Sequence, residues 1–245
     1  MTGTVRIGTS GWNYKHWIKA FYPEDLPQKE MLKFYAEHFD TVEINSSFYR
    51  LPELQTFTKW RTAVPTSFTF AVKASRFITH MKKLKAPKAS TNKLFSRVKR
   101  LEDRLGPLLF QLPPRWNCDF KRLSDFLDAM PAEEDFVFEF RDDSWLTDGI
   151  FQLLRKHNVA LCIHDHGGKE SPQEITADFT YIRMHGPGAA SYSGSYSPES
   201  LKLWAQRIKN WQRDLKAVYV YFNNDAEGHA VRNALQLRAY WEAVA

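Results

Sequence analysis

Apolar and polar residues alternate along the segment FVFEFR, residues 136–141. Because a strand has a side-chain period of two, the three phenylalanines share one face, and Glu139 and Arg141 share the other. The same alternation recurs in other short runs that are rich in β-branched and aromatic residues. The pattern predicts eight strands: Val5–Ser10, Thr41–Asn45, Phe68–Ala74, Pro107–Leu112, Asp135–Arg141, Ala160–Asp165, Phe179–His185 and Ala217–Asn224.

Between these runs, apolar residues recur at the spacing of amphipathic helices. The predicted helices are Gln28–Phe39, Pro52–Ala63, Thr91–Leu105, Asp119–Met130, Ser144–His157, Pro198–Asp214 and Ala226–Trp241. Ser197 is expected to cap the helix that begins at Pro198. The connection Gly167–Asp178 is too short and contains too much Gly and Pro for a full helix.

Strands that alternate with helices predict the α/β class, and eight of them predict a TIM-barrel-like (β/α)8 fold. An open doubly wound sheet has the same alternation, but the first strand is not followed by a GxGxxG motif. We therefore predict a single TIM-barrel-like domain over residues 1–245, irregular around the sixth strand.

The face opposite the apolar one carries polar side chains near the end of every predicted strand. They are Ser10, Glu43, Asn45, Lys73, Gln111, Glu139, Arg141, His164, Arg183, His185 and Asn223. The interior of a TIM barrel is usually filled by Val, Ile and Leu, and an unpaired buried charge costs several kcal/mol. The pattern therefore predicts a polar pocket at the carboxyl ends of the strands. The alternative is a structural network in which Glu43 pairs with Lys73 and Glu139 with Arg183.

Composition and charge narrow the function classes. The chain has 43% hydrophobic residues, a net charge of +6 and a pI near 9.2, which is typical of a soluble protein and favours anionic partners. Cys118 and Cys162 are far apart and form no CxxC motif, which suits a reducing cytoplasm. We expect a cytoplasmic protein without a signal peptide or a membrane span.

Several motifs are shared with a known family. They are GTSGWNYKHW with FYP, VEINSSFYRLP, FAVKASRFITH, LLFQLPP, FEFRDDSW, YIRMHG and YVYFNNDAEGHAVRNA, which follow one another over nearly the whole chain. In these motifs the sequence resembles the YecE-like proteins, the family named domain of unknown function 72. The resemblance implies a TIM-barrel-like fold and does not imply an activity.

The polar strand ends suggest acid–base chemistry on an anion. Glu43 and Glu139 are the expected acid–base pair, and Lys73 and His164 are further catalytic candidates. The expected ligand-binding residues are Ser10, Trp12, Tyr14, Asn45, Gln111, Arg141, Arg183, His185 and Asn223. A divalent metal and a Schiff base on Lys73 are alternatives that the residues leave open.

Two loops extend this picture. The segment His185–Ser197 is rich in Gly, Ser and Tyr and is expected to be a lid or a backbone cradle for an anion. The segment Ser75–Ser90 carries the densest run of basic residues. Both segments also fit plain solvent-exposed loops.

We expect an enzyme that acts on a phosphorylated or otherwise anionic, sugar-like small molecule. The sequence does not distinguish a hydrolase, a lyase or an isomerase. The alternatives are a nucleic-acid-binding protein or phosphodiesterase that uses the basic loop, and a non-catalytic sensor of an anionic metabolite. The sequence names no substrate, cofactor or oligomeric state.

Overall fold

The computed structural model describes residues 2–188 and 192–244 of the chain. The chain divides into two compact units. Unit 1 takes Met1–Glu43, Ile163–Gln173 and Asp178–Ala245, and unit 2 takes Ile44–Cys162 and Glu174–Ala177. The chain passes between them four times, so neither unit is one continuous stretch. The single domain predicted over 1–245 stays a prediction.

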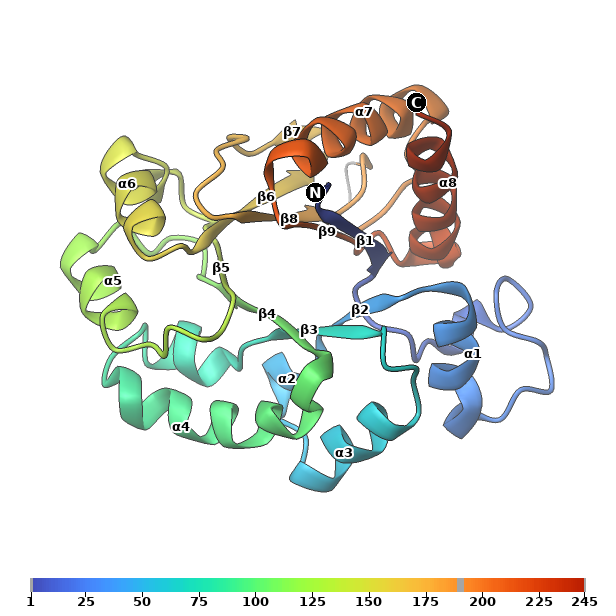
Figure 1. Cartoon of the computed structure of the whole chain (residues 1–245), viewed down its shortest axis with the longest axis horizontal. Helices are drawn as coiled ribbons and strands as arrows, with labels where there is room; N and C mark the ends of the chain where they lie inside the picture. The colour runs from blue at the N-terminus through green and yellow to red at the C-terminus, as the bar shows by residue number, and fades with distance from the viewer. Residues whose placement is uncertain (1, 189–191, 245) are drawn as a thin grey trace. The chain divides into compact units, whose positions relative to one another are not determined.

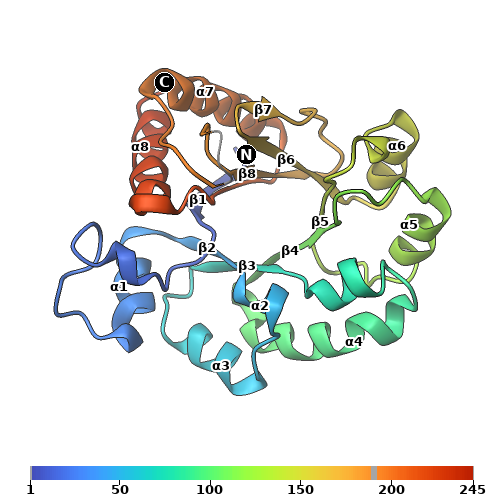
Figure 2. The ribbon, with the colours of Figure 1, turned by 180° about the vertical axis from the view of Figure 1, so that it is seen from behind.

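Unit 1 is built on parallel strands in the order β1, β9, β8, each covered by helices. In Figures 1 and 2, α7 and α8 lie side by side and cover this part of the sheet. The elements of unit 1 are β1 (Thr4–Thr9), η1 (Lys15–Trp17), η2 (Gln28–Glu30), α1 (Met31–His38), β2 (Thr41–Ile44), whose last residue belongs to unit 2, β7 (Lys169–Glu170), β8 (Phe179–Met184), α7 (Pro198–Asp214), β9 (Ala217–Phe222), η6 (Ala226–Gly228) and α8 (His229–Ala243). A bridge between Ser10 and Glu43 joins the end of β1 to β2.

Unit 2 continues the alternation with parallel strands in the order β3, β4, β5, β6. The helices α3 to α6 lie on the outer side of these strands in both views (Figures 1 and 2). Its elements are α2 (Ser46–Tyr49), α3 (Leu54–Thr62), β3 (Thr69–Lys73), η3 (Phe77–Met81), α4 (Pro87–Val98), η4 (Lys99–Arg104), β4 (Leu105–Gln111), α5 (Phe120–Leu127), β5 (Phe136–Glu139), η5 (Asp143–Trp145), α6 (Asp148–Lys156) and β6 (Ala160–His166), whose last residues belong to unit 1.

The fold is TIM-barrel-like, as the sequence predicts. All eight predicted strands are present and follow chain order within each unit. The predicted irregularity is also found: the connection after β6 has no helix, and β7 turns back to pair antiparallel with β6. No helix in the described ranges is both long enough and apolar enough to cross a membrane.

Strand alternation places the core as expected. In unit 2 the rings of Phe110 and Phe138 stack with their centroids 5.4 Å apart, and Phe126 of α5 packs edge-on against Phe110. The next ring along the strand, Phe140, stacks on Trp145 at 5.1 Å. The phenylalanine face of β5 is therefore the one buried under the helices.

Several helix boundaries differ from the predictions. The helix expected over Thr91–Leu105 is α4 from Pro87 to Val98, followed by the 3-10 turns of η4. Pro87 starts the helix earlier because proline fits its first turn. Glu102 adopts a φ of 51°, a left-handed conformation that an α-helix cannot contain. By contrast, α7 has its predicted bounds, and the Ser197 side chain caps it by accepting a hydrogen bond from the amide of Ser200.

Candidate functional site

Strand β8 presents a polar face that is fully buried. Tyr181 and Arg183 lie on it at a spacing of two residues, and His185 follows directly after the strand. Their exposed fractions are 0%, 1% and 0%. Burial of an arginine and a histidine in one row requires partners, and unit 1 provides them from β1, β2 and β9.

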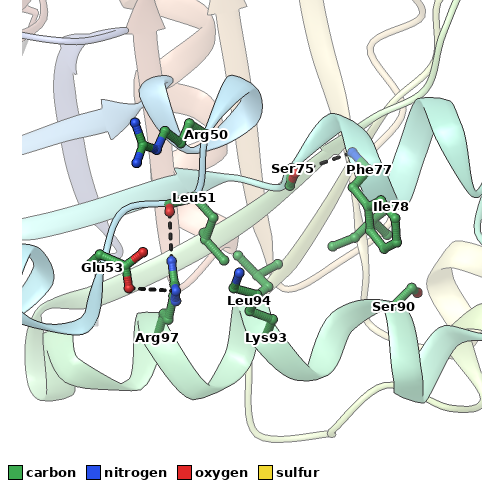
Figure 3. Close-up of a pocket in the computed structure, with 10 residues that line it drawn as sticks. All are labelled: Arg50, Leu51, Glu53, Ser75, Phe77, Ile78, Ser90, Lys93, Leu94 and Arg97. Carbon is green, nitrogen blue, oxygen red and sulfur yellow. Dashed lines mark hydrogen bonds and ion pairs between the residues drawn. The ribbon is translucent and has the colours of Figure 1, made fainter.

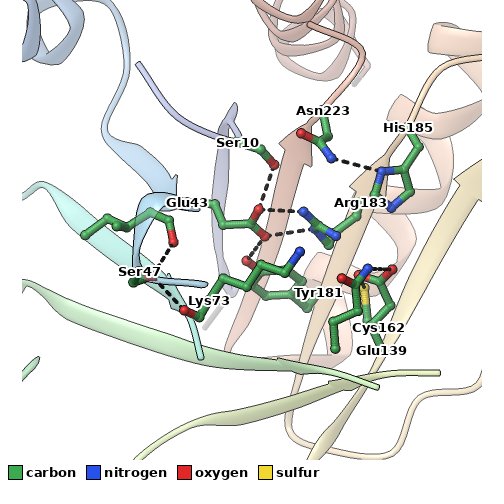
Figure 4. A network of polar contacts seen from close by, with 12 residues as sticks. Ser10, Glu43, Ser47, Lys73, Glu139, Cys162, Tyr181, Arg183, His185 and Asn223 are labelled. Carbon is green, nitrogen blue, oxygen red and sulfur yellow. Dashed lines mark hydrogen bonds and ion pairs between the residues drawn. The ribbon is translucent and has the colours of Figure 1, made fainter. Parts of the chain in front are cut away.

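Glu43 of β2 is the partner of Arg183. The Nε of Arg183 lies 2.9 Å from Oε2 of Glu43, and Nη2 lies 2.8 Å from Oε1 (Figure 4). Ser10 Oγ donates to Oε1 at 2.7 Å, and the Tyr181 hydroxyl donates to Oε2 at 2.7 Å. Burial, together with the Glu43 charge, raises the pKa of Tyr181 well above its usual value, so the phenol stays a donor. Glu43 thus accepts four hydrogen bonds, two on each oxygen.

His185 is oriented by Asn223, which follows β9. The amide Nδ2 of Asn223 donates to Nδ1 of His185 at 3.2 Å (Figure 4). A ring that accepts at Nδ1 carries its proton on Nε2 when neutral. The backbone amide of His185 donates to the carbonyl of Asp165 at 2.8 Å, which ties the end of β8 to the end of β6.

Three histidines gather at the ends of these two strands. The ring of His164 lies 6.2 Å from that of His185, and the ring of His166 lies 5.7 Å from it, centroid to centroid. Tyr192 packs against His185 at 5.4 Å and against His166 at 6.1 Å. His164 and His166 are half-buried, whereas His185 is buried, so the cluster is open to solvent on the β6 side.

The loop after β8 is held by a separate polar network. The Tyr196 hydroxyl accepts a hydrogen bond from the amide of Gly186 at 2.9 Å and donates to Asp165. Asn224 Nδ2 donates to the carbonyl of Gly194 at 2.9 Å, and the amide of Tyr196 donates to Oδ1 of Asn233 at 3.2 Å. Residues 189–191 of the predicted anion cradle lie outside the described residues.

Burial disfavours the charged form of the Asp165 carboxyl group in this network. Burial raises its pKa, while the hydrogen bond from Tyr196 acts in the opposite direction. The carboxyl is 5% exposed, and its Oδ1 has no hydrogen-bond partner among the residues described.

Unit 2 contains a second cluster around Glu139 of β5. Gln111 Nε2 of β4 donates to Glu139 Oε1 at 2.8 Å, and Arg141 forms an ion pair with the same carboxylate. Cys162 Sγ lies 4.0 Å from Glu139 Oε2 (Figure 4). Glu139 is 0% exposed, and the parallel register that sets Gln111 beside it explains the first contact.

Lys73 ends β3 and is buried at 9% exposure. Its ammonium lies 4.3 Å from the centroid of the Phe48 ring, and its carbonyl accepts a hydrogen bond from Ser47 Oγ at 2.6 Å. Burial lowers the pKa of the nearby His80, and the charges of Lys73 and Arg76 lower it further. This end of β3 is therefore electropositive.

The remaining predicted residues lie at strand ends. Tyr14 donates its hydroxyl to the carbonyl of Ser10 at 2.7 Å, and the carbonyl of Trp12 accepts from Tyr22 at 2.5 Å. Asn45 precedes α2, and its Oδ1 is buried without a hydrogen-bond partner among the described residues. Their roles in ligand binding stay predictions.

Unit 1 therefore brings together six of the predicted site residues: Ser10, Glu43, His164, Arg183, His185 and Asn223. Unit 2 groups Gln111, Glu139 and Arg141. The ion pairs seen are Glu43 with Arg183 and Glu139 with Arg141, and that the two groups share one pocket stays a prediction. Sequence reasoning missed Tyr181, His166 and Tyr192; the HDH alternation in HDHGG was the available signal for His166.

No group of three or more His, Cys, Asp or Glu side chains in the described parts of the chain is arranged to hold a metal ion. The divalent metal that the sequence leaves open therefore stays an open alternative.

Comparisons with known proteins cover most of the chain. The model of a family described as "Protein of unknown function DUF72" matches residues 6–244. The UPF0759 protein YunF of Bacillus subtilis is 25% identical, covering 95% of this chain and 93% of YunF. The UPF0759 protein YecE of Escherichia coli K12 is 27% identical, covering 85% of this chain and 82% of YecE.

Solved structures agree with the fold. A DUF72 family protein from Thermotoga maritima superposes with a TM-score of 0.87 at 30% identity, covering 98% of this chain and 99% of that chain. A putative vitamin-B12 independent methionine synthase from Listeria monocytogenes superposes with a TM-score of 0.55 at 8% identity, covering 100% and 99%. The second likeness concerns the fold alone.

Proposed function

The chain belongs to the DUF72 family, and on that premise we propose that it is an acid–base enzyme acting on a phosphorylated or otherwise anionic small molecule. The proton-transfer groups are His164, His166 and His185. The observation that carries the proposal is the packing of two half-buried imidazoles around a buried one at the ends of β6 and β8.

Histidine suits this role because its ordinary pKa is near 6.5, so it both donates and accepts protons near neutral pH. Asn223 fixes the ring of His185 so that the neutral imidazole carries its proton on Nε2. A substrate that enters from the solvent-exposed side of the cluster contacts His164 and His166, whose imidazoles accept or donate a proton. Two imidazoles in different protonation states form a general acid and a general base.

The buried carboxylate Glu43 receives a different role in this proposal. Its four hydrogen bonds fill the acceptor sites of both oxygens, so it is poorly placed to take a proton from a substrate. We assign Glu43 to positioning Arg183. Glu139, which accepts from Gln111 and pairs with Arg141, remains a candidate acid or base within unit 2.

The anionic class of substrate rests on charge. The chain has 34 Lys and Arg against 28 Asp and Glu. Lys73, Arg141, Arg183 and His185 stay the proposed contacts for the anion. Arg141 and Arg183 already form ion pairs with carboxylates, so within unit 1 we assign the larger share of anion binding to the imidazoles.

The test is a screen for turnover of phosphate monoesters, phosphodiesters and sugar phosphates, followed by histidine variants. We expect His185→Gln and His164→Gln to lower kcat by about 10²–10⁴-fold, the usual share of general acid–base catalysis. The matched control is His38→Gln, whose ring binds the carbonyl of Phe34 in α1 and lies outside the cluster. Folded cluster variants with undiminished turnover would disprove the assignment, and a panel without any turnover would exclude these phosphate esters as substrates.

A second candidate is binding of single-stranded nucleic acid by unit 2. Tyr49 and Phe77 expose 74% and 42% of their surface, and the exposed Arg76, Lys82 and Lys83 lie near Phe77 in the sequence. Exposed aromatic rings stack on bases, and cations contact phosphates. A steep fall of affinity with salt concentration supports this function, whereas weak, salt-independent binding argues against it. The third candidate, a sensor, would be stabilised against heat by a ligand that it does not convert.

A further inference from the structure

Unit 2 contains a pocket away from its glutamate cluster. It has a volume of about 520 Å³ and lies between the start of α3, the end of β3 with η3, and α4 (Figure 3). The lining residues are Arg50, Leu51, Glu53, Ser75, Phe77, Ile78, Ser90, Lys93, Leu94 and Arg97. The acid–base proposal does not use this cavity, and the nucleic-acid alternative shares only Phe77 with it.

The inner wall of the pocket is apolar. Ile78 and Leu94 are each 1% exposed, Leu51 is half-buried, and Phe77 stands at the rim with 42% of its surface in solvent. Phe77 and Ile78 both belong to the π-helical turn η3, in which the amide of Lys82 donates to the carbonyl of Phe77 at 2.8 Å. The turn leaves Phe77 partly in solvent and buries Ile78. A cavity of this size with an apolar wall fits the hydrocarbon body of a small molecule.

Arg97 lines one side of the pocket, and its charge is paired there with a carboxylate. Its Nη1 donates to the carbonyls of Leu51 and Pro52 at 2.8 and 2.7 Å, and its Nη2 lies 2.7 Å from Glu53 Oε2 (Figure 3). The guanidinium therefore fixes the chain between α2 and α3, and the Glu53 charge is compensated within the wall.

Two further cations at the pocket have no such partner. Arg50 and Lys93 lie on opposite sides of it (Figure 3), and both side chains are exposed. Within residues 2–188 and 192–244, neither of them is in an ion pair with a carboxylate. Once the Arg97–Glu53 pair is set aside, the rim carries two positive charges over an apolar wall.

We propose that this pocket binds an amphipathic anion, a small molecule with an unbranched apolar body and a single carboxylate or phosphate group. The apolar body contacts Phe77, Ile78 and Leu94, and the anionic group lies between Arg50 and Lys93. This inference does not depend on the acid–base function proposed above, because it involves none of the histidines.

The experiment is isothermal titration calorimetry of the full chain with four probes below their micelle concentrations. Octanoate and octyl phosphate combine both features, whereas octanol lacks the charge and inorganic phosphate lacks the body. We expect at least one of the first two to bind about tenfold or more tightly than octanol or phosphate. Which of the two binds tighter decides between a carboxylate and a phosphate ligand. Equal binding of octanol, or no binding of either amphiphile, would overturn the proposal.

Two variants test whether the ligand binds in this pocket. Lys93→Glu reverses a charge on the rim and is expected to weaken octanoate or octyl phosphate by about tenfold or more. Phe77→Asp makes the exposed part of the apolar wall acidic and should have the same effect without disturbing the core. Lys88→Glu is the matched control, because it reverses an exposed charge on the same helix outside the lining. Unchanged binding to both pocket variants would place the ligand elsewhere.

Discussion

Arg183 and Glu43 form a two-point ion pair at full burial, with Nε–Oε2 and Nη2–Oε1 distances of 2.9 and 2.8 Å. Ser10 and Tyr181 complete the shell of the carboxylate. Such a pair holds β2 and β8 in a fixed relation within unit 1. Removing only one of the two residues is costly because the other is then a buried charge without a partner in a low-dielectric site.

Arg183→Met is therefore expected to lower the free energy of unfolding by about 3–5 kcal/mol, as for other buried pairs that lose one partner. Urea denaturation measures the loss. The matched control is Arg207→Met, which breaks a half-exposed pair with Glu170 and should cost about 0–1 kcal/mol. The double variant Glu43→Met with Arg183→Met should recover part of the loss. Equal losses for Arg183→Met and Arg207→Met would contradict this account.

Two glycines should respond in opposite directions to alanine. Gly186 has a φ of +97°, and a Cβ there would stand 2.2 Å from the carbonyl oxygen of Ser193. Gly186→Ala should therefore destabilise by more than the roughly 1–2 kcal/mol that a left-handed residue costs. Gly149 lies in α6 with nothing within 4 Å of its added Cβ, so Gly149→Ala should stabilise by about 0.5–1 kcal/mol. Thermal unfolding measures both, and a shared sign would refute the backbone argument.

Strand alternation was enough to predict which residues share a face. It placed Glu139 opposite the phenylalanines of β5 and Arg183 opposite Ile182, and both assignments agree with the structure. Alternation does not give partners, because a partner depends on the register between strands and on side-chain rotamers. The sequence leaves open that Glu43 pairs with Lys73 of the neighbouring strand, but it does not indicate the pair that Glu43 forms with Arg183 within unit 1.

Residues with a dual character were the hardest to predict. Tyr181 counts as apolar in a hydrophobicity pattern, yet its hydroxyl donates a hydrogen bond to Glu43. The amphipathic period of α4 continues past Val98 in the sequence, but the helix ends there because the following turns tighten and Glu102 adopts a positive φ. Neither feature changes the hydrophobic pattern, so the pattern alone could not reveal it.

Asn223→Asp should raise the midpoint at which His185 titrates. The variant puts a carboxylate where the Asn223 amide now lies 3.2 Å from Nδ1, and a nearby negative charge stabilises the protonated imidazole. The Cε1–H resonance of His185 in NMR spectra, followed from pH 5 to 9, should shift its midpoint upward by about one pH unit or more. Asn210→Asp, an exposed position on α7, supplies the same charge as a control and should leave the midpoint in place. An unshifted His185 resonance in Asn223→Asp would show that Asn223 does not set the state of this ring.

Asp165 should make the protein less stable as the pH rises. Burial raises its pKa above the ordinary value of 3.8, so the folded chain favours the protonated carboxyl. Its contribution to stability is therefore full below 3.8 and is lost as the pH rises through the folded pKa. Asp165→Asn keeps an acceptor for Tyr196 and removes the charge. The melting temperature of this variant should therefore rise relative to that of the native chain between about pH 4 and pH 7. Asp142→Asn is the control, because hydrogen bonds from Ser144 lower the pKa of Asp142 below its ordinary value of 3.8. The contribution of Asp142 to stability is therefore lost only as the pH falls below 3.8, and the difference between this variant and the native chain should stay nearly constant between about pH 4 and pH 7. A constant difference between Asp165→Asn and the native chain over this range would mean that Asp165 does not titrate differently in the folded and unfolded states.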